Sequence, residues 1–257
     1  MHPMINIALR AARDASEALA HSSDRLDRVD IISHDEDNFV TSMDHNADKT
    51  ILYHLQKAYP EHCYDSRVSG LHDGKQSDTV WLIDPLLGSQ NFATGYPQFA
   101  VSIACQINGV INHAVVVNPL LREEFTASRG TGAQLNSRRL RSSPKKDLLD
   151  AMIAMGTKGS SLEVWLKIQE ALRTSQAHIR MSGCSAIDMV LTAAGRIDGG
   201  YCAKQSPQGL AAAALILRES GGFIGDGMGG PEYKSADELI FGSPKVFREL
   251  VKLRAKL

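Results

Sequence analysis

Hydrophobic residues recur along the chain with two periods, one typical of helices and one typical of strands. Near the start, Ile5, Ala8, Leu9, Ala12 and Leu19 share one face of a helical wheel, which predicts an amphipathic helix over residues 4–20. The same period predicts further helices near residues 45–58, 160–174, 185–196, 207–219 and 244–257.

Short apolar runs bounded by turn residues predict the strands. They lie at Val80–Asp84, Phe99–Ile107 and Val110–Val117, and the Asn108-Gly109 pair between the last two predicts a hairpin. A second hairpin is predicted from EEFTAS and AQLN, with its turn at Arg129-Gly130. Further strand-like stretches are AMIAM, HIRMS, GGFIG and ELIFGS.

The order of these elements predicts an α/β fold of packed layers, because a run of strands comes first and strand–helix alternation follows. We expect one domain over residues 1–257. The basic stretch 139–147 is the best candidate for a boundary between an N-terminal α+β half, 1–145, and a C-terminal α/β half, 146–257. That stretch is interpreted as a solvated loop rather than a binding patch.

Composition narrows the function classes. A formal charge of −1 over 257 residues argues against bulk electrostatic binding to nucleic acid or to a membrane surface. No apolar run is long enough to span a bilayer, and charged residues inside the first helix argue against a signal peptide. The four cysteines form no C-x-x-C pair, so we expect a reducing cytoplasm and no zinc or disulfide framework.

Asp84 is the first candidate for chemistry, because it follows a nearly all-apolar strand. A carboxylate there lies at the edge of a sheet where α/β proteins bind ligands. Gly88 and Ser89 follow, and their backbone N–H groups at a helix start suit an anion. The alternative, an ordinary turn or N-cap aspartate before Pro85, stays open.

Two further stretches carry candidate ligands. The acidic stretch from Asp35 to Asp44 suits a metal site or a solvated loop, and Asp44 also suits a helix N-cap. Gly183 and Ser185 stand at the start of a predicted helix, where N–H donors either bind an anion or are simply capped.

Taken together, these stretches resemble the inositol monophosphatase family, and most closely its bacterial SuhB-type branch. The family motif W-x-I-D-P-[LI]-D-G-T-x-N-F is matched at Trp81, Ile83, Asp84, Pro85, Leu86, Gly88, Asn91 and Phe92. Further matches are FVTSMD, FAVSIA, FTASRGTGAQLN, GCSAID, AAGRIDG and RESGG. The resemblance covers essentially the whole chain, in order.

The resemblance implies a layered αβαβα sandwich of the inositol monophosphatase and fructose-1,6-bisphosphatase type, usually a homodimer. It also implies hydrolysis of phosphate monoesters such as inositol monophosphate or a related sugar phosphate. In the family, carboxylates hold Mg²⁺, which activates water. The SuhB-type branch further implies association with the transcription machinery.

Several metal-ligand positions of the family are changed in this chain. The acidic pair of the family's GEES motif aligns with Arg67 and Val68, and the second aspartate of the central motif aligns with Leu87. The late tryptophan–aspartate pair aligns with Gln208 and Gly209, a glutamate before it with Cys202, and an upstream lysine with His34. The retained positions are Asp84, the Leu86 carbonyl, Asp44, which orients the attacking water in the family, and Ser89, which replaces a threonine.

We therefore expect a weak or unoccupied Mg²⁺ site and a catalytically inactive or strongly impaired homologue with a binding or regulatory role. The alternative is a Mg²⁺-dependent phosphomonoesterase, in which Asp35, Glu36 or Asp37 compensates for the lost ligands. Leu87 is expected to pack against apolar neighbours.

The cleft itself leaves two possibilities for Arg67. In the first, Arg67 joins Gly88, Ser89, Gly183 and Ser185 in binding a phosphate-like anion without hydrolysis. In the second, Arg67 forms a salt bridge with Asp84 that closes the site.

Overall fold

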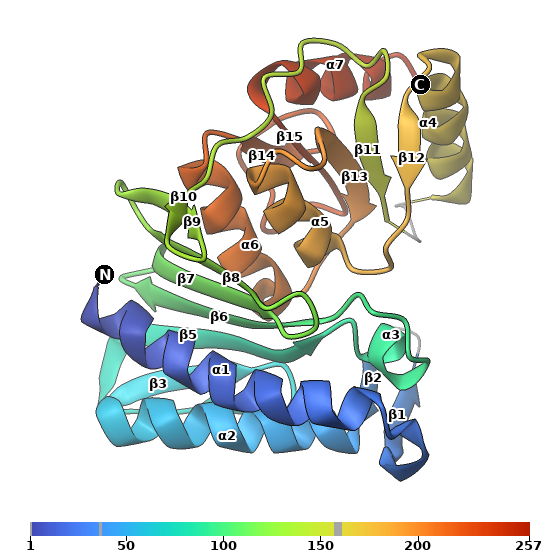
Figure 1. Cartoon of the computed structure of the whole chain (residues 1–257). Coiled ribbons are helices and arrows are strands. Elements are labelled where there is room, and N and C mark those ends of the chain that lie inside the picture. The colour runs from blue at the N-terminus through green and yellow to red at the C-terminus, as the bar shows by residue number, and fades with distance from the viewer. Residues whose placement is uncertain (1, 36–37, 157–160) are drawn as a thin grey trace.

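Five alternating layers of helix and sheet make up the molecule (Figure 1). The computed structural model describes residues 2–35, 38–156 and 161–257. Helices α1 (Pro3–Ser23) and α2 (Ser42–Ala58) form the first layer and cover one face of an eight-stranded sheet. Helices α5 (Ser185–Ala193) and α6 (Pro207–Glu219) form the middle layer. A five-stranded sheet and then α4 (Leu162–Thr174) and α7 (Pro244–Arg254) complete the stack.

The larger sheet has the strand order β10-β9-β8-β7-β6-β5-β3-β4 and is antiparallel except for the β3–β5 pair. Its strands are β3 (His62–Ser66), β4 (Gly70–His72), β5 (Gln76–Leu87), β6 (Ala100–Ile107), β7 (Val110–Asn118), β8 (Glu123–Ser128), β9 (Gly132–Leu135) and β10 (Arg138–Arg139). A short helix, α3 (Ser89–Ala93), follows β5 directly.

The smaller sheet has the order β12-β11-β13-β15-β14. Its strands are β11 (Met152–Met155), β12 (His178–Arg180), β13 (Gly199–Ala203), β14 (Phe223–Asp226) and β15 (Glu238–Gly242). A separate hairpin joins β1 (Ile31–Asp35) to β2 (Asn38–Thr41), and a 3-10 turn, η1, spans Leu26–Arg28.

Local sequence signals account for many of these boundaries. The hairpin predicted between β6 and β7 is confirmed: Asn108 and Gly109 have φ angles of 50° and 77°, the left-handed pair that a tight two-residue turn requires. Helix α6 has the predicted bounds because Ser206 caps the N–H of Gly209 and Pro207 occupies the first turn.

Several elements differ from the sequence prediction. Helix α2 begins at Ser42 rather than at residue 45, and α5 and α7 end earlier than predicted, at Ala193 and Arg254. The hairpin β1–β2 and strands β3, β4 and β13 were not predicted. Strand β13 begins with two glycines, which have low strand propensity, yet a Cβ on Gly200 would overlap the Phe241 ring of β15.

Helix α6 holds the two sheets together through its small side chains. Residues 211–214 of α6 are all alanine and all buried, so both sheets approach the helix closely. Its buried face belongs to one apolar cluster that also includes Phe125 of β8 and Phe241 of β15. The larger sheet and the smaller sheet therefore share a core with α6 between them.

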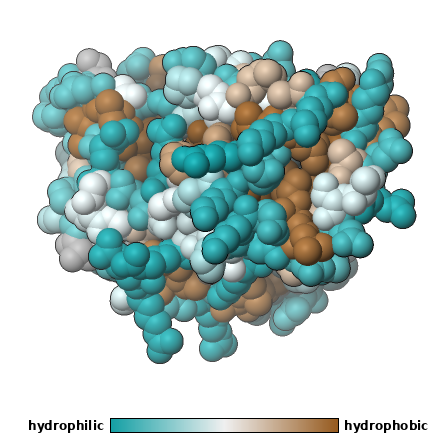
Figure 2. All heavy atoms as spheres, turned by 90° about the horizontal axis from the view of Figure 1, so that it is seen from above, coloured by the Kyte–Doolittle hydropathy of each residue, from teal (hydrophilic) through white to brown (hydrophobic). Residues whose placement is uncertain are grey.

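The outer face over α4 and α7 is mixed in character. Figure 2 views the molecule from that side and shows hydrophilic side chains interspersed with apolar patches. Leu162 and Leu166 of α4 are exposed apolar residues. Within the described residues, no helix combines the length and apolar character that a membrane span requires.

Asp188 is a carboxylic acid enclosed in the middle layer. It lies on α5 and is 2% exposed. Burial raises the pKa of Asp188 to about 7, against the opposing effect of its hydrogen bond with Ser182. The folded state therefore binds more protons than the unfolded state between about pH 4 and the folded pKa, so this group makes the free energy of unfolding fall as pH rises through that window.

We predict that Asp188→Asn removes this pH-dependent loss of stability. The difference in free energy of unfolding between the variant and the native chain should increase in favour of the variant by roughly 2–4 kcal/mol from about pH 5 to about pH 8. Urea denaturation at both pH values measures the difference. Asp150→Asn is the control, because that side chain is 71% exposed and should show no such gain. A native-like pH response of Asp188→Asn would contradict the prediction.

Candidate functional site

A turn at the end of β3 positions Arg67. The Ser66 hydroxyl donates a hydrogen bond to Asp48 Oδ1 at 2.6 Å and accepts one from the N–H of Val68 at 3.1 Å. The backbone N–H of Arg67 continues the pairing with β5 by donating to the Ile83 carbonyl at 2.9 Å. Asp48 lies on α2 and is 2% exposed, so the turn is anchored from below by a buried carboxylate.

The guanidinium of Arg67 lies among oxygen atoms from three elements. Its Nε donates to Asp84 Oδ1 at 2.8 Å, and its Nη2 donates to Asp44 Oδ1 at 2.5 Å. The same Nη2 lies 3.1 Å from both the Leu86 carbonyl oxygen and the Ser89 hydroxyl. The side chain is 18% exposed. We call Arg67, Asp44, Asp84, Leu86 and Ser89 the Arg67 cluster.

Each acceptor of the Arg67 cluster is held by its own element. Asp44 is the third residue of α2 and forms a capping box with Thr41, so Thr41 rather than Asp44 is the N-cap. Ser89 Oγ lies 2.6 Å from Asp44 Oδ1 and 2.9 Å from the Leu86 carbonyl oxygen. These contacts join the start of α2 to the start of α3.

Asp84 does not end its strand, in contrast to the prediction. Strand β5 continues to Leu87, although its pairing with β6 is irregular between Asp84 and Leu87. The irregularity begins at Pro85, which has no N–H for the ladder. Asp84 Oδ1 instead accepts a bond from the Leu86 N–H at 3.3 Å, which fixes the carboxylate over the bulge.

Electrostatics keeps Arg67 charged. Burial by itself would lower the pKa of Arg67, but the charges of Asp84 and Asp44 and the hydrogen bonds to both carboxylates raise it above its ordinary value. One guanidinium thus faces two carboxylates that are each almost fully buried, at 3% exposed for Asp84 and 0% for Asp44, and burial still raises the pKa of Asp84 against the opposing charge of Arg67.

Positions that align with lost family ligands are filled with apolar or small groups. Leu87 is 6% exposed and belongs to the apolar cluster around α6, which confirms the expected packing. Gly209 lies opposite, where an added Cβ would be 3.3 Å from Asp84 Oδ2 and 3.4 Å from Leu87 Cδ2. Val68 is half-buried beside Arg67. A glycine in place of a longer side chain lets α6 come close to β5.

The neighbouring Gln208 links helix α6 to the larger sheet. Its Nε2 donates to Asp65 Oδ1 of β3 at 2.9 Å. Gln208 stands at the start of α6, so this bond connects the middle layer to the edge of the cleft. Sequence reasoning noticed Gln208 only as a departure from the family pattern and missed Asp65, Asp48 and Ser66. The adjacent polar residues at the end of HCYDS were the available signal for Asp65 and Ser66.

The two turns proposed for anion binding lie next to each other. An added Cβ on Gly88 would approach Cys184, and one on Gly183 would lie 2.9 Å from Asn91 Oδ1. The N–H of Cys184 is already capped by the Ser182 hydroxyl at 3.0 Å. Ser185 is the first residue of α5, as predicted, but its helix has Cys184 as N-cap. Anion binding at these turns stays a prediction.

The described part of the acidic stretch before α2 belongs to the β1–β2 hairpin. Asp35 closes β1 and pairs with the first residue of β2, while Glu36 and Asp37 lie outside the described residues. His34 is exposed and packs edge-on against Phe39. Cys202 is buried in β13, where burial raises the pKa of its thiol to about 12.

Arg67 occupies the oxygen atoms that a cation at this point would use. The guanidinium donates to Asp44, Asp84 and the Leu86 carbonyl, which are the oxygen atoms that a cation would need. The described residues also contain no group of three or more His, Cys, Asp or Glu side chains arranged to hold a metal ion. Of the two possibilities for Arg67, the salt bridge with Asp84 is the one observed.

We predict that Arg67→Ala lowers the free energy of unfolding by about 3–5 kcal/mol, because it leaves two buried carboxylates without their cation. Arg13→Ala is the matched control: Arg13 also pairs with a glutamate, but its side chain is 53% exposed, so its loss should cost less than about 1 kcal/mol. Urea denaturation of both variants measures the difference. Equal losses would show that the Arg67 cluster behaves like a surface ion pair.

Comparison with known proteins identifies the family. The model of the inositol monophosphatase family matches residues 1–256. The protein named Nus factor SuhB from Pseudomonas aeruginosa is 41% identical, over 98% of this chain and 95% of its own length. The protein of the same name from Escherichia coli strain K12 is 38% identical, over 98% of this chain and 95% of its own length.

Solved structures agree with this assignment. The extragenic suppressor protein suhB of Bartonella henselae superimposes with a TM-score of 0.95 at 32% identity, over 99% of both chains. The IMPase of Thermotoga maritima superimposes with a TM-score of 0.90 at 26% identity, over 99% of this chain and 98% of that one. With the αβαβα layers and the matching motifs, these findings show that the chain belongs to the inositol monophosphatase family.

Proposed function

We propose that this chain acts as a SuhB-type binding or regulatory protein of the transcription machinery, in which an arginine has replaced the catalytic metal. The proposal has two parts. The first concerns the chemistry of the cleft, and the second concerns the partner, which is inferred from relatives that carry the name Nus factor SuhB.

The contacts of Arg67 carry the first part. The family resemblance implies that the positions of Asp84 and the Leu86 carbonyl bind metal and that the position of Asp44 orients water. Here all three accept hydrogen bonds from one guanidinium. A Mg²⁺ ion that entered would meet a fixed positive charge within hydrogen-bond distance of its ligands, a repulsion of roughly 8 kcal/mol at 4 Å in a medium of effective dielectric 20.

Hydrolysis would also need a group that activates water, and the guanidinium is unsuited to this. Arginine stays protonated and has no acceptor lone pair, so it neither removes a proton from water nor polarises it as a metal does. With Leu87 and Gly209 in place of carboxylates, the cleft has lost the charge that balances two cations. The Arg67 cluster is consequently a structural unit in this proposal.

A Mg²⁺-dependent phosphomonoesterase is the second candidate function. Its support is that Asp44, Asp84, Leu86 and Ser89 still converge on one point. For this function Arg67 would have to rotate out of the cleft when metal and substrate enter. The side chain is only 18% exposed, so such a movement would expose both carboxylates.

We predict little or no Mg²⁺-dependent hydrolysis of inositol 1-phosphate by the native chain. Its melting temperature should not change with Mg²⁺, because the guanidinium already occupies the oxygen atoms that would bind the ion. Arg67→Ala should instead be stabilised by Mg²⁺, since removal of the arginine uncovers the two carboxylates and the Leu86 carbonyl. A phosphate-release assay and thermal melts with and without Mg²⁺ measure both effects.

Arg67→Lys is the matched variant for charge. Lysine keeps the positive charge without the planar fork, so its melting temperature should stay insensitive to Mg²⁺. Robust turnover by the native chain, at a kcat of roughly 1 s⁻¹ or more, would contradict the proposal and favour the phosphatase. A Mg²⁺-dependent melting temperature of the native chain would do the same.

Two further features belong to this proposal. A homodimer is inferred from the family resemblance, and a cytoplasmic location is inferred from the isolated cysteines and from relatives named as Nus factors. All four cysteines are buried and free, which suits a reducing compartment.

A further inference from the structure

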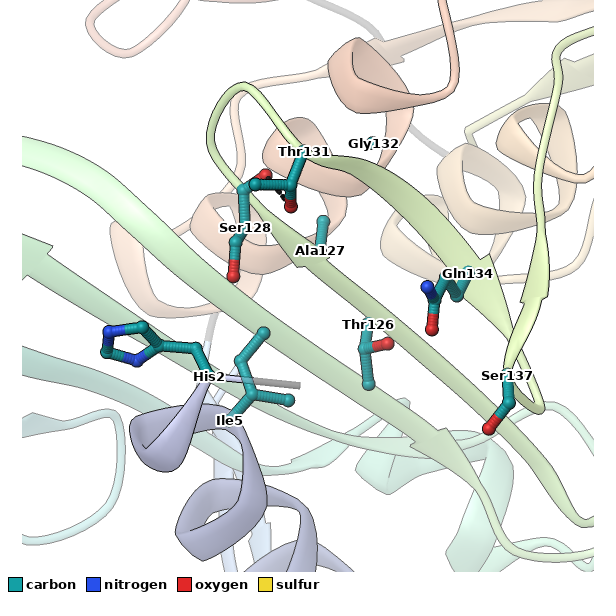
Figure 3. A pocket seen from close by; sticks show the side chains of 9 residues that line it. All are labelled: His2, Ile5, Thr126, Ala127, Ser128, Thr131, Gly132, Gln134 and Ser137. Carbon is teal, nitrogen blue, oxygen red and sulfur yellow. Dashed lines mark hydrogen bonds between the residues drawn. The ribbon is translucent and has the colours of Figure 1, made fainter.

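A second polar hollow lies on the larger sheet, apart from the Arg67 cluster. Figure 3 shows it between the start of α1 and the β8–β9 hairpin. Its volume is about 430 Å³, within the range of small-molecule sites. His2 and Ile5 form the helix side, and strands β8 and β9 form the floor. None of the residues in the Arg67 cluster lines it.

Strand alternation explains why polar groups face this hollow. Phe125 and Ala127 of β8 point into the apolar cluster around α6, so Thr126 and Ser128 point to the opposite face. Thr126 is 5% exposed, yet its hydroxyl has no hydrogen-bond partner among the described residues. This hydroxyl lines the open volume of the hollow, where it is free to bond a ligand.

Gln134 and Ser137 extend this polar surface. Gln134 is the direct cross-strand partner of Thr126, and in Figure 3 its amide and the Thr126 hydroxyl face the same space. Within the described part of the chain, the side chains of Gln134 and Ser137 make no hydrogen bond either. An amide and two hydroxyls supply uncharged donors and acceptors, the groups that pair with the hydroxyls of a sugar or polyol.

Arg139 adds one positive charge at the rim. It pairs with Gln134 across β9 and β10, so the two side chains share a face of the sheet. Its guanidinium lies over Gly132, where an added Cβ would be 3.6 Å from both Nε and Nη2. Arg139 makes no ion pair with any described residue. The carboxylate of Glu219 accepts hydrogen bonds from the N–H groups of Gly130 and Gly132, and that of Glu124 on β8 is paired with Arg13.

From these contacts we propose that the hollow is a binding site for a monosaccharide-sized polyol phosphate. Arg139 binds the phosphate, for which its planar fork is suited, and Thr126 and Gln134 bind hydroxyls of the polyol. Gly132 keeps the space below the guanidinium open, since its φ of 90° and the Arg139 contact both disfavour a side chain there. The site is independent of the function proposed for the cleft.

Isothermal titration calorimetry of the full chain with glucose 6-phosphate tests the proposal. Arg139→Gln should weaken binding about tenfold or more, because it removes a charge-assisted bond to phosphate. Thr126→Val, which keeps the shape and removes the hydroxyl, should weaken it about threefold to tenfold. Glucose alone and inorganic phosphate alone should each bind more weakly than the ester that combines them.

Two controls distinguish the hollow from other sites. Arg138→Gln removes the same charge from the neighbouring position of β10, which faces the other side of the sheet, and should leave affinity within about twofold. Ser89→Ala alters the cleft and should have no effect. Circular dichroism melts check that each variant folds. If Thr126→Val does not fold, Arg139→Gln still tests the proposal, because Arg139 is exposed and its replacement should not disturb the fold.

Four results would overturn the proposal. They are the absence of saturable binding at millimolar ligand, unchanged affinity in Arg139→Gln, an equal loss in Arg138→Gln, and a loss in Ser89→Ala. The third would indicate general attraction to a basic surface, and the fourth would place the ligand in the cleft. A phosphatase in the cleft would be recognised separately, by phosphate release that Arg139→Gln leaves unchanged.

Discussion

The buried pairing of Arg67 with Asp44 and Asp84 is the interaction on which the cleft depends. Two carboxylates that are almost fully buried cannot stay ionised side by side without a cation. The guanidinium supplies that cation from within the chain and ties together the end of β3, the bulge of β5 and the starts of α2 and α3. Asp48 and Ser66 hold the turn that carries it.

The surrounding changes are complementary to this arginine. Leu87 adds apolar contact where a carboxylate would add charge, and Gly209 lets α6 approach β5 without a side chain between them. Gln208 then joins α6 to β3 by a direct hydrogen bond to Asp65. The helix layer and the sheet therefore meet through ordinary packing and hydrogen bonds. The changes at Leu87, Gln208 and Gly209, which are separate in the sequence, all affect the contact between α6 and the larger sheet.

The cleft and the hollow beside α1 differ in their physical character. In the cleft, donors and acceptors are matched among the protein's own residues, so a ligand must displace an internal ion pair before it binds. In the hollow, Thr126 and Gln134 have no internal partner among the described residues, and Arg139 has no carboxylate. A ligand in the hollow would gain hydrogen bonds without breaking any within the protein. The two sites therefore differ in the free-energy cost of binding a ligand.

The sequence by itself determined the order of layers and the identity of the altered cleft. Periodicity located the main helices, the Asn108-Gly109 pair specified a hairpin, and motif order around Asp84 indicated the family. These signals lie in neighbouring residues, so the sequence alone is enough to recognise them. Strand β13, the bulge after Asp84 and the roles of Asp48 and Asp65 depended on tertiary structure, because each rests on a partner distant in the chain. Whether Arg67 would face an anion or two carboxylates was likewise decided by folding, since only the packing of β3 against β5 and α2 brings those oxygen atoms within its reach.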